Sequence, residues 1–181
     1  MGVNEPLART AAGARSLALD IEGAVALTRL YADYAAALDE RRFDDWIGLF
    51  LDDCRYTVQP RENHERGLPL ATIALEGTGM LRDRVHAVRD TLFHSPYYQR
   101  QVIGAPRVRA ILAADVSGRA TRVAVEANYA VFRTHLHQPS EILSVGRHLD
   151  ELVRDGNDWS FALKHVVFDT ELIPNSLIYP I

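Results

Sequence analysis

The second half of the chain alternates apolar and polar residues with a period of two, and this pattern limits the fold more than any other feature of the sequence. It begins near Tyr98 and continues through three long segments, 119–133, 141–153 and 159–169. Because successive side chains of a strand point to opposite faces of a sheet, each segment predicts a strand with one buried face. The residues expected on the buried faces are Val123, Val125, Ala127, Tyr129 and Val131, then Leu143, Val145, Leu149 and Val153, and finally Trp159, Phe161, Leu163 and Val167.

Short turn sequences separate these segments. They are Ser117-Gly118, the run 137–140 (His-Gln-Pro-Ser) and the run 155–157 (Asp-Gly-Asn). Gly, Pro, Asn, Asp and Ser are the residues that favour tight turns. Long strands joined by such turns predict an antiparallel meander.

Helices are predicted before the strands. Residues 20–38 carry apolar side chains at helical spacing, and Asp20 is placed to cap the start of this helix. The apolar residues are Leu27, Leu30, Tyr31, Tyr34 and Leu38. A second short helix follows, with Phe43, Trp46, Ile47 and Phe50 on one face.

The stretch between the helices and the meander is less regular. Residues 54–59 alternate like a strand that Pro60 ends, and residues 61–67 are expected to form a polar loop. Thr78 is placed to cap a third helix that continues to about Val88.

Helices followed by a long antiparallel sheet are typical of an α+β fold. The economical packing is a strongly curved sheet wrapped around the first helix, which forms a cone with a concave interior, and such interiors often hold ligands. We therefore expect a mobile arm over residues 1–17 and a single cone domain over residues 18–181.

Composition excludes several classes of function. The net charge of −4 gives no reason to expect a nucleic-acid partner. No apolar run is long enough for a membrane span, and the first residues lack the apolar core of a secretory signal, so we expect a cytoplasmic protein. The single cysteine, Cys54, allows no intrachain disulfide and cannot supply the ligands of an iron–sulfur cluster.

Several motifs in order resemble the small (β) subunits of aromatic-ring-hydroxylating dioxygenases. They cover the chain from about Leu27 to its end. These motifs are 53–58 (Asp-Cys-Arg-Tyr-Thr-Val), 62–69 (Glu-Asn-His-Glu-Arg-Gly-Leu-Pro), 80–85 (Met-Leu-Arg-Asp-Arg-Val), 98–104 (Tyr-Gln-Arg-Gln-Val-Ile-Gly) and 169–177 (Asp-Thr-Glu-Leu-Ile-Pro-Asn-Ser-Leu).

The resemblance implies a nuclear-transport-factor-2-like cone and a place in a complex of three small and three large subunits. It implies that the large subunit holds the Rieske 2Fe-2S cluster and a mononuclear non-heme Fe(II), and that electrons come from NAD(P)H through a reductase. The small subunit would then trimerise and anchor the large subunits, without catalytic residues, cofactors or metal ions of its own. The run 63–68 is most similar to members that act on aromatic acids.

An alternative function remains open, because the cone fold also serves free-standing dehydratases, isomerases and small-ligand binders. Such enzymes use Asp or His as acid or base and Tyr as hydrogen-bond donor. The fallback site of this kind is Tyr31, Asp39 and His165, with Tyr34 and His148 as further candidates. A dehydratase of this type is expected to have histidine after Arg100, where this chain has Gln101.

The remaining polar candidates are assigned to surfaces. Arg82, Asp83, Arg84 and Arg100 are predicted at a subunit interface, since arginine pairs well with carboxylates of a partner. The His135 and His137 pair lies at a predicted turn and is not assigned a metal, and His64, His86 and His94 are expected at the surface or at an interface. Cys54 is expected to be buried. The apolar, proline-containing segment 172–181 is expected to dock either on its own sheet or on a neighbouring subunit.

Overall fold

The structure, a computed structural model, describes residues 19–170 and 177–181, so the predicted arm at 1–17 lies outside the described residues. The described chain begins with the helices α1 (Ile21–Asp39) and α2 (Phe43–Ile47), which confirms both predicted helices. Phe50, which was predicted on the face of the second helix, instead begins the first strand. Asp20 caps α1 as predicted, because its carboxylate accepts a hydrogen bond from the Gly23 amide at 2.6 Å.

Short elements connect these helices to the long strands. They are β1 (Phe50–Pro60), α3 (Arg61–Glu65), β2 (Ile73–Glu76), α4 (Gly77–His86) and the π-helical turn η1 (Ala87–Thr91). The prediction of a loop at 61–67 was wrong for its first five residues, which form α3. Thr78 does not cap α4, because α4 already begins at Gly77 and the Thr78 hydroxyl donates instead to Asp52 at 3.2 Å.

The remaining strands form most of one curved sheet. They are β3 (Tyr97–Ile103), β4 (Arg107–Ala114), β5 (Ala120–His135), β6 (Glu141–Asp155) and β7 (Asp158–Phe168). The strand order is β2-β1-β7-β6-β5-β3, and β4 also pairs with β5. The predicted meander is present in β5, β6 and β7, but β1 joins β7 in parallel, which the strand pattern did not predict.

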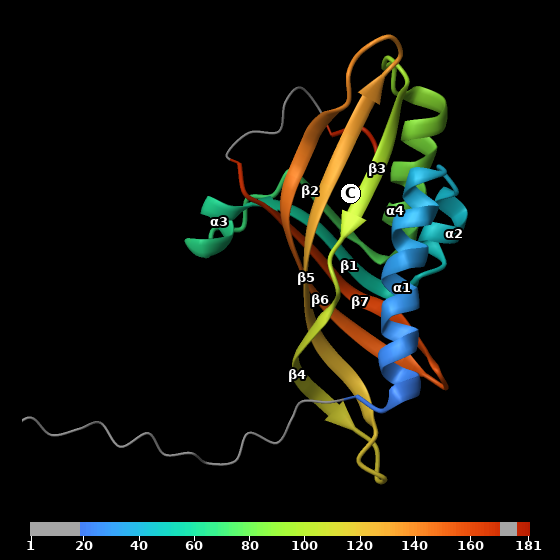
Figure 1. Cartoon of the computed structure of the whole chain (residues 1–181), viewed down its shortest axis with the longest axis vertical. Coiled ribbons are helices and arrows are strands. Elements are labelled where there is room, and N and C mark those ends of the chain that lie inside the picture. The colour runs from blue at the N-terminus through green and yellow to red at the C-terminus, as the bar shows by residue number, and fades with distance from the viewer. Residues whose placement is uncertain (1–18, 171–176) are drawn as a thin grey trace, which may run out of the picture.

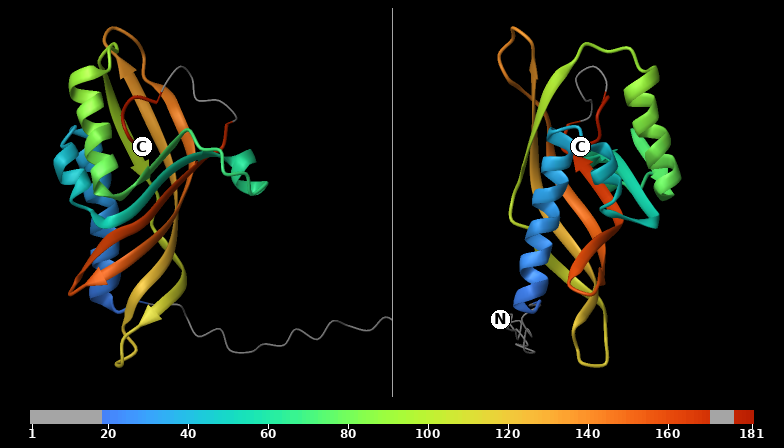
Figure 2. Two further views of the ribbon diagram at one scale, coloured as in Figure 1. Left: turned by 180° about the vertical axis from the view of Figure 1, so that it is seen from behind. Right: turned by 90° about the vertical axis from the view of Figure 1, so that its right-hand side faces the viewer.

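The sheet bends around α1, which packs against β3 and β7 (Figure 1). In the right-hand view of Figure 2, β3 lies on one side of the molecule and α4, which contacts β1 and β2, lies on the other. The space between them holds one apolar core, in which Trp46, Tyr34, Tyr56 and Phe161 have almost no exposed surface. The predicted α+β cone is confirmed.

The buried face of β5 is the predicted one. Its apolar residues alternate inward from Val123 to Val131, and all five predicted positions are buried. This strand is regular over that range, so the period of two in the sequence translates directly into one face.

The buried face of β6 differs from the prediction after Leu143. The pairing with β5 shifts by one residue between Phe132 and Val131, so that Leu143 forms a bulge. An extra residue in one strand exchanges the two faces beyond it. The inward residues are therefore Ser144, Gly146, His148, Asp150, Leu152 and Arg154, whereas the predicted Val145 lies on the outer face, and Leu149 and Val153 are only half-buried.

A second bulge changes β7 in the same way. Trp159 and Phe161 are buried as predicted, but the pairing with β6 shifts between Leu152 and Glu151. Beyond this bulge Lys164 points inward and Leu163 is only half-buried. Two bulges in the adjacent strands β6 and β7 thus bring Asp150 and Lys164 into the core.

Candidate functional site

A buried ion pair lies on the inner face of the sheet. The Lys164 ammonium donates to the Asp150 carboxylate at 2.8 Å, and neither side chain has any exposed surface. The Tyr31 hydroxyl from α1 donates to the same carboxylate at 2.5 Å, and the backbone amide of His165 donates to its other oxygen at 3.2 Å. Every charge in this group is therefore matched by a direct partner.

Aromatic rings surround the cation of this pair. The Lys164 ammonium lies 4.9 Å from the ring centroid of Tyr31, 4.5 Å from that of Tyr34 and 4.8 Å from that of Phe161. Burial lowers the pKa of Lys164 to about 8, against the attraction of Asp150, which raises it. The rings and the carboxylate stabilise the charged form of the ammonium.

His148 lies beside this pair without a hydrogen-bond partner for either ring nitrogen among the described residues. Its ring stacks on Tyr129, with centroids 4.6 Å apart and planes 19° apart. Burial, and secondarily the charge of Lys164, lowers the pKa of His148 well below 6.5. The imidazole is therefore neutral at physiological pH and packs as an aromatic ring.

The three fallback residues of the alternative function have separate surroundings. Tyr31 belongs to the buried ion pair. The Asp39 carboxylate, at the end of α1, accepts from the Gln101 amide at 2.9 Å and lies 3.6 Å from Arg100, and burial raises its pKa. The His165 ring lies 3.0 Å from the Gln59 side chain and packs on His64, and burial lowers its pKa to about 4. No hydrogen bond joins the side chains of any two of the three.

The sequence argument missed Asp150 and Lys164 as members of the polar interior. Both lie in strands for which the strict period of two predicted other residues on the buried face. The sequence signal pointed the other way: His148, Asp150 and Arg154 share one parity in β6, whereas most apolar residues of that strand, Leu143, Val145, Leu149 and Val153, share the other. Only the bulges decide which parity faces the core.

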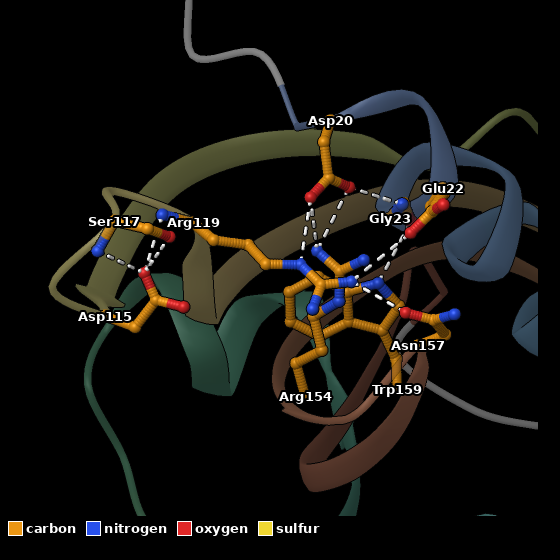
Figure 3. Close-up of polar contacts among 9 residues, drawn as sticks. All are labelled: Asp20, Glu22, Gly23, Asp115, Ser117, Arg119, Arg154, Asn157 and Trp159. Atoms are coloured by element: carbon orange, nitrogen blue, oxygen red, sulfur yellow. Dashed lines mark hydrogen bonds and ion pairs between the residues drawn. The ribbon is translucent and has the colours of Figure 1, made fainter.

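A second polar cluster ties the start of α1 to two turns of the sheet (Figure 3). The Arg154 guanidinium donates to both carboxylate oxygens of Asp20, at 3.0 and 2.9 Å, and lies over the Trp159 ring. Arg119 donates to Asp20 at 3.1 Å and to Asn157 at 2.7 Å. The bond from Arg154 is the main cause that lowers the pKa of Asp20 to about 2. This cluster fixes the helix against the sheet.

The predicted interface arginines differ in their contacts. Arg84 donates to the carbonyl oxygens of Leu177 and Ile178, at 2.7 and 2.8 Å, so it holds the end of the chain. Arg82 is exposed and donates to Thr78, and Asp83 is exposed on the same helix. Arg100 is exposed on β3.

The outer face of the sheet is apolar around Arg100. We call the exposed residues Tyr98, Val102, Ile142 and Val145 the outer apolar face. The strand register joins them, because Val102 pairs with Ala130, which pairs with Val145, and Arg100 pairs with Phe132, which pairs with Ile142. Contiguous exposed apolar residues on adjacent strands are typical of a surface that another protein covers.

Within residues 19–170 and 177–181, no group of three or more His, Cys, Asp or Glu side chains could hold a metal ion. His137 lies in the turn between β5 and β6 with a φ of 64°, and His135 packs on Tyr97. Cys54 is buried, as predicted. No helix in the described part of the chain has the length and hydropathy needed to cross a bilayer.

The fold defines the class first. The beta subunit of the benzoate 1,2-dioxygenase from Burkholderia mallei superimposes with a TM-score of 0.63, covering 84% of this chain and 92% of that one at 14% identity. At this identity the match shows the cone fold alone.

The family follows from closer matches. The model of the ring hydroxylating beta subunit family matches residues 34–175, and the chain belongs to this family. A crystal structure from Novosphingobium aromaticivorans, assigned as the beta subunit of an aromatic-ring-hydroxylating dioxygenase, is 31% identical with a TM-score of 0.76, covering 87% of this chain and 95% of that one. The predicted resemblance is thus confirmed.

Two relatives have more specific names. The anthranilate 1,2-dioxygenase small subunit of Burkholderia cepacia is 28% identical over 148 residues, which are 82% of this chain and 88% of that protein. The terephthalate 1,2-dioxygenase terminal oxygenase component subunit beta 2 of a Comamonas species is 28% identical over 120 residues, 66% of this chain and 73% of that protein. As a small subunit, the chain functions beside a larger partner.

Proposed function

We propose that this chain is the structural subunit of a dioxygenase that adds both atoms of dioxygen to the ring of an aromatic acid. The family match over residues 34–175 carries this proposal. The relatives named for anthranilate and terephthalate support an aromatic acid as the substrate of the complex. The chain acts in the cytoplasm as one cone domain, residues 18–181, preceded by an arm at 1–17.

The cofactors of this complex belong to the large subunit in our proposal. A Rieske cluster takes two thiolates and two imidazoles, and this sequence has one cysteine, which is buried. The large subunit would hold that cluster and the mononuclear non-heme Fe(II), and a reductase would deliver electrons from NAD(P)H. This chain would contribute no catalytic residue.

The complex contains three small and three large subunits in our proposal, with the small subunits as a trimer. The outer apolar face supports a role in assembly, because leaving it in contact with water is unfavourable. Arg100 in its centre, and Arg82 and Asp83 on α4, would add ion pairs with a neighbouring subunit. Arg84 would act through the segment 177–181 that it holds.

Affinity purification of the full-length chain from its native host tests the proposal. We expect an iron-containing large subunit to be recovered in equal amount, in a particle of six chains by native mass spectrometry. Recovery of the chain alone, without iron, would contradict the proposal and favour the free-standing acid–base enzyme, for which Tyr31, Asp39 and His165 would be the first residues to replace.

A matched pair of variants tests the assembly face. Val102→Arg places a charge in the outer apolar face, and we expect the affinity for the partner to fall about tenfold or more, which corresponds to at least roughly 1.4 kcal/mol. Val116→Arg places the same charge in the exposed turn between β4 and β5, outside this face. Equal recovery of the large subunit with both variants would exclude the outer apolar face as the interface.

A further inference from the structure

The interior of the cone is occupied by the chain itself. Residues 177–181, which we call the tail, lie between the sheet and α4 (Figure 2). Leu177, Tyr179 and Ile181 are buried, and Ile181 has no exposed surface. For these residues the structure decides between the two predicted docking places, because the tail packs inside its own cone.

Two phenols converge on one oxygen atom of the tail. The hydroxyls of Tyr34 and Tyr56 donate to the backbone oxygen of Ile181, at 2.6 and 2.8 Å. The Ile181 amide in turn donates to the Tyr56 hydroxyl at 3.0 Å. The Gln99 side-chain amide donates to the Pro180 carbonyl at 3.0 Å. These donors come from α1, β1 and β3, so the folded cone sets their positions.

A cation also contacts the tail. The Arg84 guanidinium donates to the carbonyls of Leu177 and Ile178. The Nε atom of Arg84 is buried and has no partner among the described residues.

The ring of Tyr179 fills an aromatic recess. Its centroid lies 4.5 Å from that of Tyr97, 5.3 Å from that of His94 and 6.0 Å from that of Phe43. The His94 ring also lies 2.9 Å from the Tyr179 hydroxyl. The interior therefore accepts an aromatic ring as well as oxygen acceptors.

This combination is that of a small-molecule site. Ligand pockets are mostly apolar and contain a few placed polar groups that fix the orientation of the ligand. Here two phenols, an amide and a guanidinium point at carbonyl oxygens of the tail. Buried donors without an acceptor are costly, so an emptied interior would favour a ligand that supplies oxygen atoms at these positions.

We propose that the cone contains a binding site for a small aromatic carboxylate, and that the tail occupies this site as an internal ligand. A carboxylate takes the place of the Ile181 backbone oxygen between Tyr34 and Tyr56, and the ring occupies apolar space that the tail now fills. This inference assigns a ligand to a subunit that the proposed function treats as structural, and it rests only on contacts within this chain.

The tail competes with the ligand. A tethered segment has an effective concentration on the order of millimolar, so a ligand binds the intact chain more weakly than a chain whose tail is removed. The apparent affinity of the intact chain equals the affinity of the open site multiplied by the fraction of molecules in which the site is open.

The first experiment compares the full-length chain with one that ends at Ser176. Titration calorimetry with benzoate is expected to show binding to the shortened chain at least about tenfold tighter than to the full-length chain, and the peptide Leu-Ile-Tyr-Pro-Ile is expected to compete. Benzyl alcohol, which has the ring but no carboxylate, is expected to bind at least about tenfold more weakly than benzoate.

Variants of the shortened chain locate the site. Tyr34→Phe with Tyr56→Phe is expected to weaken benzoate binding about tenfold or more, since two hydrogen bonds to the carboxylate are lost. Tyr98→Phe, on the outer apolar face, is the matched control and is expected to leave it unchanged. Equal affinities of the Tyr34/Tyr56 variant and the control would overturn the proposal.

A second variant covers the case in which the shortened chain does not fold. Tyr179→Ala with Ile181→Ala keeps the tail backbone and its bonds to Arg84 but removes the two side chains that fill the interior. If this folded variant, or a folded shortened chain, shows no saturable benzoate binding up to about ten times the effective concentration of a tethered tail, the proposal is wrong. Since the isolated chain is used, this outcome is independent of whether a large subunit is recovered from the host.

Discussion

At the scale of single residues, Asp150 and Lys164 show how the cone accommodates charge. Removing two ions from water costs several kcal/mol each, and their attraction offsets this cost only if every further hydrogen-bonding group is matched. The Tyr31 hydroxyl and the His165 amide donate further hydrogen bonds to the Asp150 carboxylate, and three aromatic rings surround the Lys164 ammonium. Loss of either partner should therefore be more harmful than loss of an exposed pair.

Lys164→Met tests this expectation. It leaves Asp150 buried without its cation, and we expect the free energy of unfolding to fall by about 3–5 kcal/mol in urea denaturation at pH 7. Adding Asp150→Asn should recover part of the loss. Arg29→Met removes the cation of the exposed pair with Asp158 and should cost no more than about 1 kcal/mol. Similar losses in the two single variants would show that the buried pair contributes no more than the exposed one.

The buried His148 should make the free energy of unfolding depend on pH. Because burial lowers its pKa well below 6.5, the unfolded chain binds a proton in a pH range where the folded chain does not. The contribution of His148 to the free energy of unfolding is therefore fully present above pH 6.5. It is lost as the pH falls below 6.5, by about 1.4 kcal/mol per pH unit for one proton. His165, with a pKa of about 4, contributes in the same direction between pH 6.5 and 4.

His148→Phe should remove one of these two contributions and keep a ring on Tyr129. We expect the fall in unfolding free energy between pH 6.5 and 5 to become smaller than in the unmodified chain, as measured by urea denaturation at both pH values. The control is His137→Asn, in an exposed turn whose positive φ asparagine tolerates. An unchanged pH slope in His148→Phe would show that His148 is not the group responsible.

At the scale of secondary-structure elements, the contact between β6 and β7 depends on one glycine. A Cβ atom at Gly146 would lie 2.0 Å from the Val167 carbonyl oxygen and 2.8 Å from the Phe168 Cα atom. Both are backbone atoms of β7, so neither can move aside without loss of the strand pairing. The close approach of the two strands therefore requires glycine at this position.

Gly146→Ala should separate β6 from β7 locally. We expect a loss of at least about 3 kcal/mol in unfolding free energy, at the upper end of the range for overpacking. Gly79→Ala is the matched control, because nothing lies within 4 Å of the added methyl group in α4, and alanine favours a helix by about 1 kcal/mol over glycine. Thermal melts of both variants measure the difference, and equal stabilities would contradict the role of Gly146.

The elements also show what the sequence could and could not predict. α1 and the inner face of β5 follow from a regular periodicity and a capping aspartate, and both were predicted. The inner faces of β6 and β7 were predicted only in part: Leu143, Trp159 and Phe161 are buried as predicted, but one extra residue at each bulge exchanges the faces beyond it, and the sequence does not mark where a bulge occurs. The polar interior was missed for the same reason, since Asp150 and Lys164 lie beyond the bulges.

The parallel pairing of β1 with β7 is a different kind of limit. These strands are distant in sequence, and their pairing depends on how the chain between them folds. The cone itself was predicted from the order of helices and strands together with the family motifs. The docking place of residues 177–181 stayed open in the sequence, because an apolar segment fits its own core and a neighbour's surface equally well.

At the scale of the whole molecule, the two ends of the described chain are each hydrogen-bonded to the rest of the cone, at different places. Asp20, at the start of α1, is bound to the turns of the sheet by Arg154 and Arg119 (Figure 3). Ile181 is bound inside by Tyr34 and Tyr56. The tail therefore belongs to the core of the molecule, and the stability of the cone should depend on its last side chain.

Ile181→Ala measures this dependence. It removes most of a fully buried side chain and leaves a cavity, and we expect a loss of about 2–3 kcal/mol in the free energy of unfolding, within the range for isoleucine in a core. Ile21→Ala is the matched control, since Ile21 is 83% exposed in the first turn of α1. If urea denaturation of the isolated chain gives the same stability for both variants, the tail does not contribute to the core. A loss confined to Ile181→Ala would instead mean that a ligand entering the cone must first displace a segment that stabilises the core. The free energy of packing the tail would then explain both the weak benzoate binding of the intact chain and the tight binding without the tail.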